Sequence, residues 1–102
     1  MRFVVSGESM MPDYHEGDYL LVFGTKKIRV GNDVVVCDPR DQSRLILKRI
    51  GGVKKNKIFL LGINNASSTD SRVFGWVDVG LIIGKVWFRY FPLFGRGKFW
   101  FW

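Results

Sequence analysis

Two residue types in this sequence could do chemistry together: a serine near the N-terminus, Ser9, and a lysine in mid-chain, Lys48. Ser9 follows Gly7 and precedes Pro12, so its turn is constrained, because glycine permits unusual backbone angles and proline biases its predecessor to extended geometry. Such a serine can present Oγ as a nucleophile and its own N–H as a donor to a carbonyl oxygen. Taken alone, Ser9 is a loop serine with a role in the turn.

Lys48 belongs to residues 44–50, a segment that predicts a β-strand. Side chains alternate between the faces of a strand, so Lys48 shares its face with Ile46 and Ile50, which would desolvate the ammonium group and lower its pKa. A lysine general base near neutral pH needs its pKa lowered by about 3 from ~10.4, roughly 4 kcal/mol of differential solvation. The strand pattern alone favours the alternative, a lysine whose stem covers apolar surface while its charge stays in water.

The residues directly after Ser9 are candidates for a substrate groove. They are Met10, Met11 and Pro12. The methionine pair could line such a groove, but the more common use of methionine in an all-β domain is to fill the core.

Other nucleophilic or metal-binding residues form weaker patterns. His15, the only histidine, lies in an acidic segment where a surface turn is expected, and a Ser-His-Asp triad would require it. Cys37 ends a run of valines and is interpreted as a small buried apolar residue rather than a nucleophile. One histidine and one cysteine cannot form a zinc site, and the carboxylates lack calcium-loop spacing. The sequence therefore predicts no metal and no other cofactor.

The elements that must position these residues are predicted to be strands almost throughout. Strand-forming runs occupy residues 19–23, 33–37, 44–50, 58–61 and 81–90. Turn residues, among them the pair Gly51-Gly52, separate the runs and leave no window of eleven residues with a helical period. We expect an all-β single domain of short, mostly antiparallel strands in a curled or barrel-like sheet.

Composition limits the class of protein. With 102 residues, 47% of them apolar, the chain is one globular domain rather than a disordered or fibrous protein. The single cysteine favours a reducing compartment. No stretch approaches the ~18 apolar residues that cross a bilayer, and no secretory signal is present, so we expect a protein without a transmembrane anchor. With the reducing compartment, this indicates a cytoplasmic protein that is soluble or peripherally associated with a membrane.

The formal charge of +7 is compatible with nucleic acid, an anionic membrane surface or an acidic partner. The excess lies in residues 26–57, which hold ten basic and three acidic side chains. Solvated hairpin loops are preferred over a binding patch as its explanation.

Several short boxes between Val5 and Pro92 resemble, in order and spacing, those of the type I signal peptidase family of serine proteases. They are Ser9-Met10-Met11-Pro12, Gly17-Asp18, Lys48-Arg49-Ile50-Gly51, Gly62-Ile63-Asn64, Ser68-Thr69-Asp70-Ser71-Arg72-Val73-Phe74-Gly75, Gly84-Lys85-Val86 and Tyr90-Phe91-Pro92. Each box alone is weak evidence, whereas the ordered set is specific.

The resemblance implies a role for each of five residues. Ser9 would be the nucleophile and Lys48 the neutral general base that activates it. Ser68 would orient the lysine amine, and Asp70 and Arg72 would form a supporting ion pair.

The sequence departs from the family pattern in three places. Gly31-Asn32-Asp33 and Gly62-Ile63-Asn64 differ from the usual turn boxes, and only eight residues precede Ser9, where the family carries a membrane anchor. This short form resembles the nickel-type superoxide dismutase maturation proteases, which remove an N-terminal extension from a cytoplasmic precursor. We therefore expect a catalytic domain over residues 1–92, a precursor protein as its substrate, and an aromatic and basic tail over residues 93–102.

Two alternatives remain open. A signal-peptidase-like enzyme could process secreted precursors at the membrane surface, held there by the tail, since tryptophan and basic residues suit the headgroup region. The tail could instead pack on the sheet. A non-enzymatic basic β-barrel that binds single-stranded nucleic acid is the other alternative, but it leaves the ordered boxes as coincidence.

Overall fold

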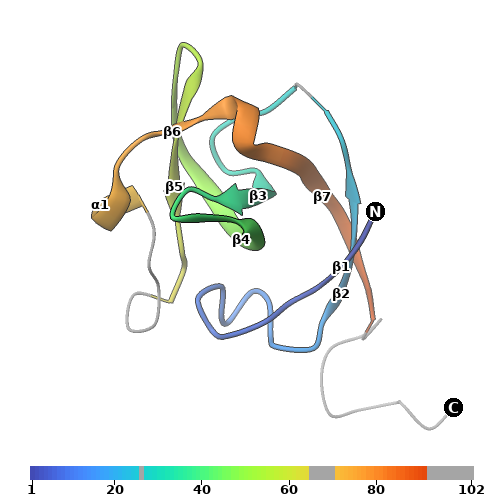
Figure 1. The fold of residues 1–102 in the computed structure, drawn as a ribbon. Coiled ribbons are helices and arrows are strands. Elements are labelled where there is room, and N and C mark those ends of the chain that lie inside the picture. The colour runs from blue at the N-terminus through green and yellow to red at the C-terminus, as the bar shows by residue number, and fades with distance from the viewer. Residues whose placement is uncertain (26, 65–70, 92–102) are drawn as a thin grey trace, which may run out of the picture.

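The computed structural model describes residues 1–25, 27–64 and 71–91, and these form one antiparallel sheet (Figure 1). The seven strands follow the order β1-β2-β7-β3-β4-β5-β6. Their bounds are β1 Arg2–Val4, β2 Tyr19–Phe23, β3 Asp33–Asp38, β4 Asp41–Lys54, β5 Lys57–Leu61, β6 Val77–Asp78 and β7 Ile82–Phe91. Helix is confined, within these residues, to α1 (Ser71–Phe74) and the 3₁₀ turn η1 (Val79–Leu81). The all-β prediction is confirmed, and the sheet is open rather than closed into a barrel.

The long strand β4 corrects one prediction. Gly51 and Gly52 do not form a turn but lie inside β4, where the pairing with β5 shifts register between Ile50 and Gly52. A side chain at Gly51 would collide with Leu61 on β5, so the glycine allows the two strands to approach closely at this bulge. The strand therefore continues to the basic hairpin at Lys54–Lys57 instead of ending at residue 50.

Two apolar clusters form the core, one on each face of β3. The first contains Val34, Val36, Ile46, Ile50, Ile58, Leu60 and Val77. The second contains Val5, Met10, Leu20, Val22, Val35 and Leu47. Consecutive valines of β3 point alternately into the two clusters and are fully buried, as is typical of a strand covered on both faces.

A buried carboxylate fixes the segment between β1 and β2. Asp18 is 0% exposed; it accepts a hydrogen bond from the His15 N–H (2.8 Å) and an ion-pair contact from Arg89 of β7 (3.3 Å). A buried charge requires such partners because it has lost its hydration. Val5 donates to the Asp18 carbonyl (2.9 Å) and accepts from the Gly17 N–H (2.8 Å), so the two ends of the segment are held together.

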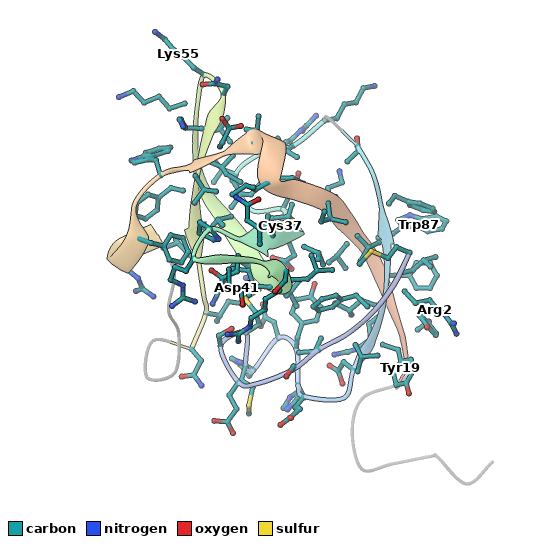
Figure 2. The ribbon with its side chains drawn as sticks, in the orientation of Figure 1. Arg2, Tyr19, Cys37, Asp41, Lys55 and Trp87 are labelled. Atoms are coloured by element: carbon teal, nitrogen blue, oxygen red, sulfur yellow. The ribbon has the colours of Figure 1, made fainter. Side chains whose placement is uncertain are left out.

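Seven of the nine described basic residues between positions 27 and 57 are exposed, although five of the nine lie within β4 or β5 rather than in loops. Lys54, Lys55 and Lys57 are exposed at the β4–β5 hairpin, with Lys55 at its tip (Figure 2), whereas Lys26 lies outside the described residues. Cys37 is half-buried rather than buried. In the part of the chain that the structure describes, no helix is long and apolar enough to span a membrane.

Candidate active site

Ser9 and Lys48, from distant parts of the sequence, line the same cleft of about 290 Å³. One wall is the segment that leads from β1 through the Ser9 turn, and the other is the β3–β4 hairpin. In Figure 1 this blue segment passes below the hairpin. The lining residues are Phe3, Val5, Ser6, Gly7, Glu8, Ser9, Met10, Arg40, Arg44, Leu45, Ile46, Leu47 and Lys48.

Lys48 is buried, with 4% of its surface exposed. It pairs across the sheet with Val34, and its neighbours along the same face, Ile46 and Ile50, belong to the first core cluster. The alternative of a solvated surface lysine is therefore wrong, because tertiary packing covers the stem and the amine together. Desolvation of this kind disfavours the ammonium form.

The Ser9 turn is held by backbone hydrogen bonds on both sides of the serine. The Ser9 carbonyl accepts from the Asn64 N–H (2.8 Å), and the Met11 N–H donates to the Glu8 carbonyl (3.1 Å). Gly7 has φ +81°, a left-handed conformation that glycine adopts without strain, as the sequence predicted for an unusual backbone here. The turn leaves Ser9 partly exposed at the cleft.

The groove candidates occupy three different environments. Met10 is 2% exposed, packs in the second core cluster and also lines the cleft. Met11 is half-buried and Pro12 is exposed, and neither is among the lining residues.

Of the three supporting candidates, only Arg72 is described. It is exposed and lies in α1. Ser68 and Asp70 lie outside the described residues, so their roles stay predictions.

A polar network that sequence reasoning missed connects the two walls. Arg49, next to Lys48, contacts Asp33 of β3 (2.6 Å) and Asp13 of the Ser9 segment (2.9 Å), while the Tyr14 hydroxyl donates to Asp33 (2.6 Å). Hydrogen bonding to Asp33 raises the pKa of Arg49, and burial followed by the same carboxylate raises the pKa of Tyr14. The partners are far apart in sequence, so no local pattern indicated the network, which ties the strand of Lys48 to the segment of Ser9.

One edge of β4 is open at the cleft. β4 pairs in register with β3 along residues 45–49, with an irregularity between Leu45 and Asp41, and its pairing with β5 begins only at Arg49. Among the described strands, none pairs with the other edge of residues 44–48, which line the cleft. Unpaired backbone groups of this kind can accept an extended peptide as an additional strand.

The other nucleophile candidates lie elsewhere. His15 is half-buried, and its backbone N–H binds Asp18; neither it nor Cys37 lines the cleft. The arrangement therefore brings together a hydroxyl, a buried amine and an open strand edge, which suit peptide-bond chemistry.

Comparison with known proteins identifies the family. The chain belongs to the Peptidase S24-like family, whose model matches residues 2–87. Mitochondrial ATP-independent inner membrane protease subunit 1a of Arabidopsis thaliana is 35% identical over 89% of this chain and 73% of its own length. Mitochondrial inner membrane protease subunit 1 of Homo sapiens is 30% identical (86% and 68% covered), and signal peptidase IB of Staphylococcus aureus strain N315 is 48% identical (78% and 34% covered). The prediction of a signal-peptidase-like serine peptidase is thereby confirmed.

Proposed function

We propose that this chain is an endopeptidase with a Ser/Lys dyad, in which Ser9 is the nucleophile and Lys48 the general base. The observation that carries the proposal is that both residues line one cleft in a member of a peptidase family. Burial of Lys48 supports it, because desolvation favours the neutral amine, the form that can accept a proton from serine.

In the proposed reaction, Ser9 Oγ attacks the scissile carbonyl carbon while the Lys48 amine takes the hydroxyl proton. The tetrahedral intermediate collapses, the C–N bond breaks, and the Lys48 ammonium returns the proton to the departing amine. Lys48 then accepts a proton from the water that attacks the acyl-enzyme carbonyl, and as the ester C–Oγ bond breaks the Lys48 ammonium returns this proton to Ser9 Oγ, which regenerates both residues. By resemblance to the family, Ser68 would orient the amine and Asp70 with Arg72 would support the site.

The open edge of β4 supports an extended peptide as the substrate. A peptide that pairs with residues 44–48 would reach Lys48 at the end of the open edge, where Ser9 lines the opposite wall. Met10, which lines the same cleft, is the candidate for contact with its side chains, together with Met11 and Pro12, which follow it in sequence.

Single substitutions test the dyad. We expect Ser9→Ala and Lys48→Ala each to lower kcat/KM for peptide cleavage by about a thousandfold or more, while the fold is retained by circular dichroism. Lys55→Ala, an exposed lysine at the hairpin tip, is the matched control and should keep full activity. Cleavage that survives either dyad substitution contradicts the mechanism.

For the substrate, we propose a cytoplasmic precursor from which an N-terminal extension is removed, namely a nickel-type superoxide dismutase precursor. The support is the resemblance in Phe74-Gly75 after the Asp70 box and in the terminal Phe91-Pro92. Co-expression of the precursor with the wild-type chain or with Ser9→Ala, followed by mass spectrometry, tests it. A precursor left uncut by the wild-type chain contradicts this substrate without contradicting the dyad.

A second candidate is processing at a membrane surface, favoured by an exposed aromatic group on β2 and β7. Phe23, Trp87 and Phe88 are 48%, 61% and 44% exposed and contact one another, with ring centroids 4.7 and 5.0 Å apart (Figure 2 labels Trp87). Tryptophan and phenylalanine at a surface suit the bilayer interface. Liposome co-sedimentation of the wild-type chain, Trp87→Ser and a chain lacking residues 93–102, which lie outside the described residues, tests this; absence of lipid binding by the wild-type chain rejects it.

A further inference from the structure

The cleft has charged side chains that the proposed reaction does not use. Arg40 and Arg44 lie on the wall formed by the β3–β4 hairpin, and Glu8 lies on the opposite wall beside Ser9. A guanidinium group presents donors in a rigid fork that matches a carboxylate. These charges can therefore select among peptides.

The two arginines differ in what already binds them. Arg40 donates through Nε (3.1 Å) and Nη2 (3.0 Å) to the buried carboxylate of Asp38, and it lies over the Phe74 ring at 5.6 Å. Within the described residues, no hydrogen bond or ion pair engages the exposed Arg44 guanidinium; the two carboxylates that its charge acts on, Asp38 and Asp41, accept hydrogen bonds from Arg40 (3.0 Å) and Ser43 (2.6 Å) instead. Arg44 is thus the arginine available to a substrate.

The position of Arg44 on β4 determines which side chain of a bound peptide it would contact. Arg44 lies four residues before Lys48 on β4, beside the irregularity in the pairing with β3, and four residues of a strand span at most ~13 Å at ~3.3 Å each. A peptide that pairs with this edge also rises by ~3.3 Å per residue. Its side chain near Arg44 therefore lies about four residues from the bond at Lys48.

We propose that the cleft selects peptides with a carboxylate side chain about four residues from the scissile bond, bound by Arg44. The inference rests on the proposed function, because it takes the open edge of β4 as the substrate site. Glu8, next to Ser9, repels a carboxylate close to the scissile bond. The preference for a carboxylate side chain should therefore be greatest near Arg44 and weaken at positions nearer to Ser9.

A peptide series tests the proposal, with aspartate or asparagine placed at each position within about five residues of the bond. We expect one aspartate position to raise kcat/KM about three- to tenfold over asparagine, and salt to reduce the effect. Arg44→Gln should abolish the preference, and Arg44→Glu should transfer it to lysine at the same position. Arg29→Gln, an exposed arginine in the β2–β3 loop, is the control and should leave it unchanged.

The outcomes separate the inference from the proposed function. Cleavage that depends on Ser9 but shows no aspartate preference, or a preference that survives Arg44→Gln, overturns the inference alone. If the wild-type chain cleaves none of the peptides in a way that depends on Ser9, the proposed function is contradicted. Binding of fluorescent aspartate and asparagine peptides to Ser9→Ala then decides the inference without turnover: tighter aspartate binding that Arg44→Gln removes supports it, and equal affinities overturn it.

Discussion

A lysine in the middle of a strand ordinarily keeps its amine in water, yet Lys48 is 4% exposed between two isoleucines of its own face. The charged form of such a side chain loses hydration, which favours the neutral amine. At the scale of single residues, this environment distinguishes Lys48 from the exposed lysines of the β4–β5 hairpin. Burial of this kind supports the role proposed for Lys48, because a general base must be neutral to accept a proton.

Arginine in place of Lys48 should abolish cleavage at every pH. The pKa of a guanidinium lies above about 12, so the group stays protonated and cannot take the proton of Ser9. In the wild-type chain, activity should rise with pH as the Lys48 amine deprotonates, since only the neutral form is a base. Profiles of kcat/KM between about pH 5 and 10 measure both, with Lys55→Arg as the control. Activity in Lys48→Arg above background contradicts the assignment.

A second residue-scale prediction concerns Asp38, which is 1% exposed. Hydrogen bonding from Arg40 lowers the pKa of Asp38 below its usual value. A carboxyl group with a depressed pKa stabilises the fold above its unfolded pKa of ~3.9, and this contribution is lost as pH falls through the folded pKa. Asp38→Asn should therefore lower Tm clearly at pH 7 and progressively less toward pH 2.

Thermal unfolding at both pH values measures the effect, with Glu8→Gln, an exposed acid, as the control. A Tm difference between the wild-type chain and Asp38→Asn that does not change with pH contradicts the role of the carboxylate.

At the scale of elements, the two halves of β4 have different roles. Its first half lines the cleft with an open edge, and its second half pairs with β5 from Arg49 onward, through the bulge at Gly51. The network of Arg49, Asp33, Asp13 and Tyr14 ties the strand to the Ser9 segment at the point where the two halves meet. The network thus connects the strand of Lys48 to the segment that carries Ser9.

Replacement of Gly84, a buried glycine of β7, by alanine should destabilise the sheet. The added Cβ would lie 2.6 Å from the Phe23 carbonyl oxygen and 2.7 Å from Val22 Cγ1, so the backbone of β2 would have to move, and overpacking of this kind costs about 1–3 kcal/mol. Gly24→Ala is the control, because its Cβ would meet only the Ile83 carbonyl oxygen, at 3.8 Å. Urea denaturation measures the free energy of unfolding, and an unchanged value for Gly84→Ala would show that β2 moves away from β7 here without cost.

At the scale of the whole molecule, β3 joins the two core clusters. Val34 and Val36 pack in the first cluster, and Val35 packs in the second. Because one strand is shared, neither cluster can lose its packing without exposing part of the other. The described sheet should therefore unfold as one cooperative unit.

Val35→Ala tests this cooperativity. Val35 is 0% exposed, so its truncation should cost about 2 kcal/mol through lost apolar contact and the cavity left behind. Tryptophan fluorescence and far-ultraviolet circular dichroism should shift to the same lower urea midpoint. Val30→Ala, at a site 61% exposed, should change the midpoint little. Separate midpoints for the two probes would mean that the clusters unfold independently.

The strand positions followed from the sequence, because apolar runs and turn residues act over a few neighbouring positions, and the choice of Ser9 and Lys48 followed from the ordered boxes rather than from either local pattern alone. Tertiary structure decided the rest. The short strands β1 and β6 exist through pairing with partners, and the glycine pair lies at a bulge inside β4 because β5 pairs on both sides of it. The burial of Lys48, the Arg49 network and the shared cleft depend on contacts between residues far apart in the chain. Local sequence patterns do not indicate such contacts, because packing and charge pairing form only when distant segments meet.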